Sequence, residues 1–136
     1  MRDVHSAYAE LVRAWGSRLG LVSERDLDRF RERHIEDSLR LLPLLDSLPV
    51  GPAVDVGSGA GLPGIPLAIS RPQREWRLLE PRRRRSAFLE EVVRELALDN
   101  CEVVIATAQE AARDPRLARA HVLATARALT PPKDVA

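Results

Sequence analysis

Apolar residues recur at two different spacings along the chain, and the change between them divides the sequence. Up to about residue 48 they repeat every three or four positions, as on the buried face of an amphipathic helix. The first stripe is followed by Gly20, where a glycine often closes a helix. A second helical stretch is predicted from Ser23 to Pro43, which should end or kink it. The first stripe consists of Ala7, Leu11, Val12, Trp15 and Leu19.

From residue 49 onward, short apolar runs alternate with helical stretches, a pattern typical of βαβ units around a parallel sheet. The predicted fold class is therefore α/β, a Rossmann-like sheet of about four parallel strands with an N-terminal helical appendage. We expect residues 1–48 to pack on the core and residues 49–136 to form the sheet domain, because 136 residues are too few for two ordinary domains. The expected strands are 53–56, 76–80, 101–106 and one within 121–126, and the expected helices are 64–70, 82–98 and 109–113.

Two groups of side chains are expected to have structural roles. Trp15, Trp76 and Phe88 are most simply core residues. His34 and Asp37 stand three positions apart on one predicted helix face. They either pack against a ligand-binding loop or cap the helix at the edge of the core.

The net charge of +1 conceals an uneven distribution of arginine. Lys133 is the only lysine, whereas Arg71, Arg74, Arg77 and Arg82 to Arg85 crowd into a short stretch. The last four fall in the first turn of a predicted helix, where each positive charge is disfavoured by about a few tenths of a kcal/mol. This arrangement favours an anionic partner, with RNA phosphate as the natural candidate. The alternative is a solvated basic run.

Cysteine content and hydropathy indicate the compartment. Cys101 is the only cysteine, so no internal disulfide can form, and no Cys or His residues stand near it at zinc-ligand spacing. We therefore expect no metal and a reducing, cytoplasmic environment. The first residues lack the apolar region of a signal peptide, and no apolar run approaches the roughly 20 residues that span a bilayer. We expect no membrane association.

The most informative segment is Asp55-Val56-Gly57-Ser58-Gly59-Ala60-Gly61, where the first strand should pass into a helix. Glycines allow a sharp turn and a close approach to a ligand, and the following helix start offers unpaired N–H groups. A dinucleotide fingerprint needs a sixth-position glycine, where this chain has Leu62, and no phosphate-loop Lys-Ser/Thr follows. A nicotinamide-dependent oxidoreductase is therefore disfavoured. A tight turn without a ligand remains the structural alternative.

Glu80 supplies a second part of the predicted site. It stands at the end of the second expected strand, near the spacing of about 20 residues at which such folds place a carboxylate on a ribose diol. A glycine loop with a strand-end acid predicts a nucleoside site. S-adenosylmethionine fits better than a nucleotide, because its amino-acid and sulfonium end is compatible with Asp55, whereas a diphosphate would be repelled.

Four segments together resemble the glucose-inhibited division protein B family, whose members methylate guanine N7 in small-subunit ribosomal RNA. The cofactor loop of that family is similar to residues 55–68, DVGSGAGLPGIPLA. Residues 33–39 (RHIEDSL) resemble its N-terminal helical motif, and residues 79–89 its second-strand and helix motif. Residues 125–128 (TARA) resemble the segment after its fourth strand. The resemblance extends over roughly residues 21–129.

This resemblance implies a class I methyltransferase that binds S-adenosylmethionine and acts on small-subunit ribosomal RNA, free or in an assembled particle. Arg127 would bind the target. No catalytic acid or base is expected, because guanine N7 carries a free lone pair and the reaction needs only alignment. The residues that would contact the cofactor are Asp55, Gly57, Ser58, Gly59, Gly61, Leu62, Glu80, Ala108 and Gln109.

The sequence departs from the family pattern in three places. An acid is expected at position 109 and another near 122, but this chain has Gln109 and Val122. Family members also continue through three more strands, so the resemblance implies a C-terminally shortened domain whose fourth strand becomes an open edge. We expect either a homodimer through that edge or a poorly ordered C-terminus. The alternative function is a cofactor-binding but catalytically inactive homologue.

Overall fold

The computed structural model describes residues 3–21 and 24–126 and contains one parallel sheet of four strands, in the order β3-β2-β1-β4. The strands are β1 (Ala53–Val56), β2 (Trp76–Leu79), β3 (Cys101–Val104) and β4 (Leu123–Ala126). The register pairs Val56 with both Leu79 and Ala126, so the carboxyl ends of the strands are level. The predicted α/β class, with about four parallel strands, is confirmed.

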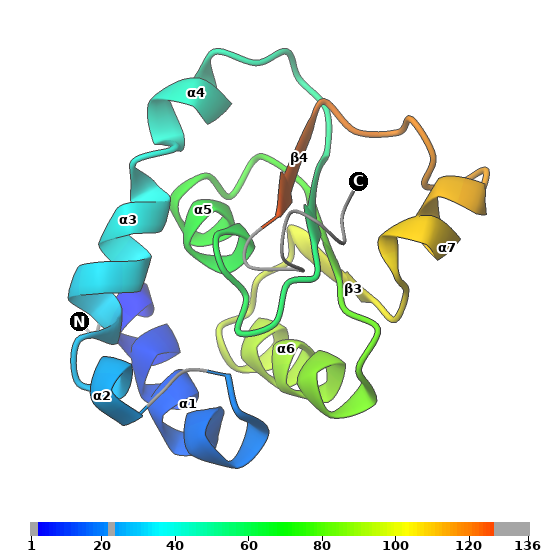
Figure 1. Ribbon diagram of the computed structural model, residues 1–136. Coiled ribbons are helices and arrows are strands. Elements are labelled where there is room, and N and C mark those ends of the chain that lie inside the picture. Colours follow the sequence, from blue (N-terminus) through cyan, green and yellow to red (C-terminus); the bar gives the residue numbers. More distant parts are fainter. Residues whose placement is uncertain (1–2, 22–23, 127–136) are drawn as a thin grey trace, which may run out of the picture.

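Three helices connect the strands: α5 (Gly64–Ser70), α6 (Arg83–Glu95) and α7 (Ala108–Arg113). The chain passes outward from β1 to β2 and β3 and then returns across β1 to form β4. Because parallel crossovers are right-handed, a reversal of direction places the connecting helix on the other face of the sheet. Figure 1 shows α7 on the opposite side of the sheet from α5 and α6.

The first half of the N-terminal segment folds as predicted and the second half differs. Helix α1 (Val4–Leu19) ends at Gly20, whose φ of 64° is left-handed. The second predicted stretch is broken into α2 (Glu24–Leu27), a π-helical turn η1 (Arg31–Ile35), α3 (Glu36–Leu39) and α4 (Leu42–Asp46). Pro43 lies in the first turn of α4, where its missing N–H is not needed, so it begins a helix instead of ending one.

One hydrophobic core joins the N-terminal helices to the sheet domain. Tyr8 and Val12 of α1 are fully buried in it together with Trp76 and Phe88, which confirms the core prediction for the last two. The prediction is wrong for Trp15, which is 38% exposed. Its ring lies on the flank of the buried row of α1 and beneath the guanidinium of Arg18, 5.7 Å from the ring centre.

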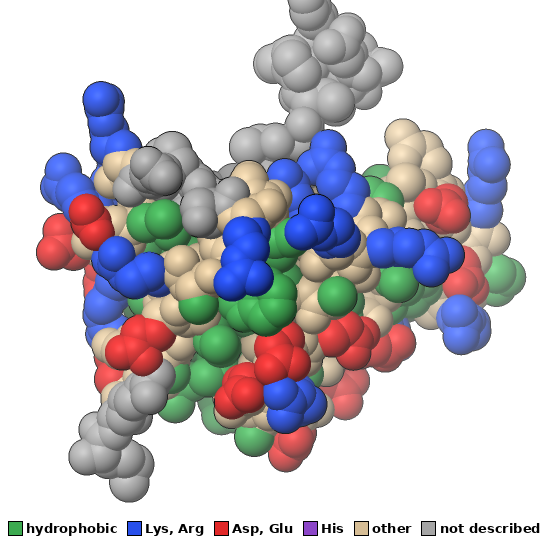
Figure 2. Space-filling view, turned by 90° about the horizontal axis from the view of Figure 1, so that it is seen from below, with side chains coloured by type: hydrophobic (Ala, Val, Ile, Leu, Met, Phe, Trp, Pro, Cys, Tyr) green, Lys and Arg blue, Asp and Glu red, His purple; other side chains and the backbone are tan. Residues whose placement is uncertain are grey.

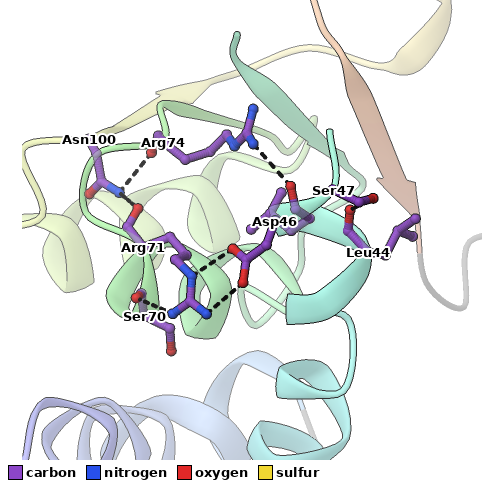
Figure 3. Close-up of polar contacts among 8 residues, drawn as sticks. Leu44, Asp46, Ser47, Ser70, Arg71, Arg74 and Asn100 are labelled. Carbon is purple, nitrogen blue, oxygen red and sulfur yellow. Dashed lines mark hydrogen bonds and ion pairs between the residues drawn. The ribbon is translucent and has the colours of Figure 1, made fainter. Parts of the chain in front are cut away.

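Arginine side chains fasten the segment that enters β1 to the end of α5 (Figure 3). Arg71 donates two hydrogen bonds to the carboxylate of Asp46, at 2.7 and 2.8 Å, and thereby holds the pKa of that carboxyl below its usual value. Arg74 donates to the carbonyl oxygens of Leu45, Pro49 and Gly51. The predicted division between residues 48 and 49 therefore falls inside a tightly bonded segment, and it stays a prediction. Within the described ranges, no helix has the length and apolar character needed to cross a membrane.

Candidate functional site

The predicted ligand loop lies at the carboxyl edge of the sheet, between two strands whose connections run in opposite directions. Residues 57–61 follow β1, which has β2 on one side and β4 on the other. Ligands of open α/β sheets bind outside the carboxyl ends of the strands at such a reversal point. The fold therefore places the glycine loop where a ligand is expected.

Asp55 in β1 organises this loop from beneath. Its side chain is fully buried, and one carboxylate oxygen accepts hydrogen bonds from the hydroxyl of Ser58 (2.8 Å) and the backbone N–H of Gly64 (3.2 Å). The other oxygen accepts from the hydroxyl of Thr125 in β4 (3.0 Å). One carboxylate therefore joins the loop, the start of α5 and the neighbouring strand. This bracing role was not predicted from the sequence, although the order Asp-x-Gly-Ser is consistent with it.

Two glycines of the loop are required for different reasons. Gly61 has a φ of 99°, and a Cβ there would stand 2.5 Å from Cγ1 of Ile65 and 3.1 Å from the hydroxyl of Tyr8. Gly59 is also left-handed, with a φ of 57°, but the nearest atom to its Cβ position is the Gly57 carbonyl oxygen at 3.9 Å. The loop is thus packed tightly against the protein at Gly61 and has open space at Gly59.

Tyr8 was missed as a site residue by the sequence analysis. Its hydroxyl donates a 2.6 Å hydrogen bond to the carbonyl oxygen of Ala60, and the whole side chain is buried. Helix α1 therefore contacts the glycine loop directly. The available signal was a single polar aromatic residue on an apolar helix face, which does not reveal its partner.

Replacing Tyr8 by phenylalanine is expected to lower the free energy of unfolding by about 1–3 kcal/mol. The change removes the donor and leaves the Ala60 carbonyl, which is 8% exposed as a residue, without that bond. Urea denaturation measures the difference. The control is Ala14→Ser on the exposed side of α1, with an expected loss of about 0.5 kcal/mol. Equal losses in the two variants would contradict the bracing role of the hydroxyl.

Glu80 lies directly after β2 and joins the loop to the next helix. Its side chain is 3% exposed. One carboxylate oxygen accepts from the N–H of Gly59 and the other from the N–H of Arg82, both at 2.9 Å. A carboxylate has about four lone-pair positions, so two backbone donors leave acceptor capacity for hydroxyl groups. Sequence spacing alone predicted this acid, and the structure brings it to the glycine loop.

The remaining predicted cofactor contacts lie in two places. Leu62 is buried in the hydrophobic core, so only its backbone is available to a ligand. Ala108 and Gln109 form the exposed first turn of α7, which Thr107 and Glu110 cap by reciprocal hydrogen bonds. Arg127, the predicted target-binding residue, lies outside the described residues.

His34 and Asp37 have structural contacts in the N-terminal segment. The ring of His34 packs against that of Phe30 with centres 5.6 Å apart, and Asp37 approaches Arg40 at 3.9 Å.

Burial raises the pKa of the Cys101 thiol to about 12. Among the described residues, no group of three or more His, Cys, Asp or Glu side chains is arranged to hold a metal ion.

Comparison with known proteins gives matches over nearly the whole chain. Residues 2–136 match the family described as "GidB: rRNA small subunit methyltransferase G". The ribosomal RNA small subunit methyltransferase G of Granulibacter bethesdensis is 51% identical over 87 residues, which are 64% of this chain and 40% of that protein. The protein of the same name from Streptomyces coelicolor is 46% identical over 125 residues, 91% of this chain and 50% of its own. The chain thus spans about half the length of these relatives.

A solved structure gives a weaker likeness. The precorrin-6y C5,15-methyltransferase of Geobacter metallireducens aligns with 55% of this chain and 40% of its own, with 21% identity and a TM-score of 0.48. The fold assignment rests on the strand order and crossovers described above.

Proposed function

We propose, because the chain belongs to the GidB family of rRNA small subunit methyltransferase G, that it binds S-adenosylmethionine at the carboxyl ends of β1 and β2. The proposed reaction is methylation of guanine N7 in small-subunit ribosomal RNA. The observation that supports this most strongly is the 2.9 Å hydrogen bond from Gly59 to Glu80, which joins the glycine loop to an acid at the end of the neighbouring strand.

The residues present at this edge fit S-adenosylmethionine. The open space at the Cβ position of Gly59 allows a ligand to approach the loop backbone closely. Glu80 retains lone pairs for the ribose hydroxyls, as argued above. Asp55 is committed to bonds within the protein, so its proposed contribution to the methionine portion is the shape it gives to residues 57–61. Gln109 at the start of α7 is proposed to lie beside the adenine, where its amide can donate or accept a hydrogen bond.

When bound, the cofactor supplies an activated methyl group on a sulfonium. Guanine N7 carries a free lone pair at neutral pH, so the protein does not need to remove a proton from it before methyl transfer. Its residues therefore hold the two reactants in line, and alignment of this kind contributes roughly 7–11 kcal/mol in well-oriented reactions. Arg127 is proposed to bind the RNA target, through phosphate or the guanine edge.

Isothermal titration with S-adenosylmethionine and its demethylated product tests the cofactor site. We expect saturable binding by the wild-type chain and a loss of about tenfold or more in Glu80→Gln, which removes a charged acceptor. Gly59→Val should abolish binding, because its side chain enters the open space. A cooperatively folded protein that binds neither compound would overturn the proposal. Arg116→Ala, which changes an exposed arginine away from the loop, serves as the control.

Transfer of a labelled methyl group to unmethylated small-subunit RNA, naked or assembled, tests the reaction. Incorporation at a guanine supports the full proposal. Cofactor binding without incorporation would instead support the alternative function, a cofactor-binding but catalytically inactive homologue.

The proposed partner is small-subunit ribosomal RNA in the cytoplasm. β4 pairs with β1 along one edge, and we propose that its other edge pairs with a second copy of the chain. The molar mass from light scattering checks this, since a monomer at high concentration would rule out the dimer.

A further inference from the structure

Five arginines of this chain gather around one hollow and differ in their partners from several others. Arg13, Arg71 and Arg94 each form an ion pair with a nearby carboxylate. By contrast, Arg18 and the four arginines 82–85 surround one hollow of about 330 Å³ between the end of α1 and the start of α6. Among the side chains that the structure describes, no carboxylate forms an ion pair with any of these five. We call this hollow, with its five arginines, the α1–α6 arginine cleft.

The cleft is built from two segments that the sequence keeps far apart. Arg85 is half-buried, and its guanidinium lies 3.4 Å from the carbonyl oxygens of Leu19 and Gly20, at the end of α1. This contact joins the end of α1 to the first turn of α6, on the two sides of the cleft. Arg18, Arg82, Arg83 and Arg84 are exposed around it. The four exposed guanidinium groups are thus held around one hollow by the packing of α1 against α6.

An exposed aromatic ring borders the same surface. Trp15 is 38% exposed, and the guanidinium of Arg18, which lines the cleft, lies over its ring at 5.7 Å from the ring centre. Figure 2 views the molecule from the side of α1 and α6 and shows basic side chains in a band across this face. Adjacent arginine and tryptophan match the two parts of a single-stranded nucleic acid, because arginine binds phosphate and tryptophan stacks on a base.

The position of the cleft relates it to the proposed reaction site. The N–H of Arg82 donates to Glu80, so the cleft begins where the cofactor loop is fastened. We infer that the α1–α6 arginine cleft binds the phosphates of an unpaired RNA segment beside the target, with a base stacked on Trp15. This inference rests on the proposed RNA substrate. It extends the docking surface to the end of α1, which lies outside the four segments carrying the family resemblance.

Binding of a short, fluorescein-labelled, unstructured RNA to the full chain, followed by anisotropy over a range of salt, tests this inference. For the Arg83→Ala/Arg84→Ala variant we expect about tenfold or more weaker binding, and a slope of log affinity against log salt smaller by about 1.4. The matched control is Arg40→Ala/Arg116→Ala, which removes two exposed, ion-paired arginines elsewhere and should leave the slope nearly unchanged. Equal slopes in the two double variants would overturn the inference.

Intrinsic fluorescence provides a second readout that a loss of charge does not produce. The other tryptophan, Trp76, is 1% exposed, so RNA should quench only Trp15. Trp15→Phe should keep the affinity and lose the quenching, whereas Trp15→Leu should bind about tenfold more weakly. Unchanged fluorescence at saturating RNA would exclude the stacked base.

The cofactor titration separates this inference from the proposed function. Cleft variants that bind S-adenosylmethionine normally but lose RNA support both. A wild-type chain that binds RNA as described but no cofactor overturns only the proposed function. A chain that binds the cofactor but shows no affinity for this RNA overturns only the inference that the α1–α6 arginine cleft binds RNA.

Discussion

Gly61→Ala should lower the free energy of unfolding by about 2–5 kcal/mol and abolish binding of S-adenosylmethionine. Its backbone φ of 99° disfavours any side chain, and the new Cβ would overlap Cγ1 of Ile65 at 2.5 Å. Backbone strain of this kind costs about 1–2 kcal/mol and overpacking about 1–3 kcal/mol more. Ile65 belongs to the buried core, so the loop must move instead. Denaturant unfolding and calorimetric titration of the same variant measure both effects.

Gly59→Ala is the matched control, because it has the same backbone handedness without the overlap. Its loss of stability should be about 1–2 kcal/mol, from strain alone. Its effect on cofactor binding should nevertheless be large, since the new methyl group enters the open side of the loop. If Gly61→Ala proves no less stable than Gly59→Ala, the packing described at residue 61 is wrong.

Asp55→Ala is the second change with a large expected effect, about 3–5 kcal/mol of unfolding free energy. It leaves the buried hydroxyl of Ser58 and the buried N–H of Gly64 without this acceptor. The partly buried hydroxyl of Thr125 keeps only the carbonyl oxygen of Val54, at 3.4 Å. Each unsatisfied buried donor costs about 1–3 kcal/mol, less whatever the surroundings recover by relaxing. Thermal and urea unfolding measure the loss.

Asp55→Asn distinguishes hydrogen bonding from simple volume. The amide oxygen can still accept from Ser58 and Gly64, while the amide nitrogen turns toward Thr125, whose hydroxyl can accept in place of donating. We expect a loss of about 1–2 kcal/mol. Thr125→Val, which removes one donor and keeps the carboxylate, should lose about 1 kcal/mol. A loss in Asp55→Asn equal to that in Asp55→Ala would show that the charge itself, and not the acceptor, is what stabilises the loop.

The sheet domain was predictable because its signals are local. Apolar runs bounded by glycine and proline placed β1 and α5 at the bounds that the structure has, Ala53–Val56 and Gly64–Ser70. The N-terminal segment between Ser23 and Pro43 was harder, because apolar residues at helical spacing do not reveal a π-helical turn or breaks between short helices.

In the candidate site, too, contacts between residues close in sequence were predictable and contacts between distant segments were not. Glu80 and the glycine loop were found from spacing along one strand–loop–helix unit, and the structure brings them within a hydrogen bond of each other. The partners from outside that unit, Tyr8 and Thr125, were missed because their contacts depend on how distant segments pack. Trp15 was assigned to the core because composition predicts burial of indole on average and cannot give the direction of one ring.

The hydrogen bond between Tyr8 and Ala60 links the docking of α1 to the form of the glycine loop. Linkage of this kind is reciprocal, because a ligand that holds the loop in place must by the same free energy hold the helix against it. A ligand bound at the carboxyl ends of the strands therefore stabilises the contact between α1 and the glycine loop. A partner that displaces α1 lowers the affinity of the loop for its ligand. α1 also carries Arg18 and Trp15. Binding at the α1–α6 arginine cleft therefore changes the affinity of the glycine loop for its ligand, and the reverse, although the two ligands do not touch.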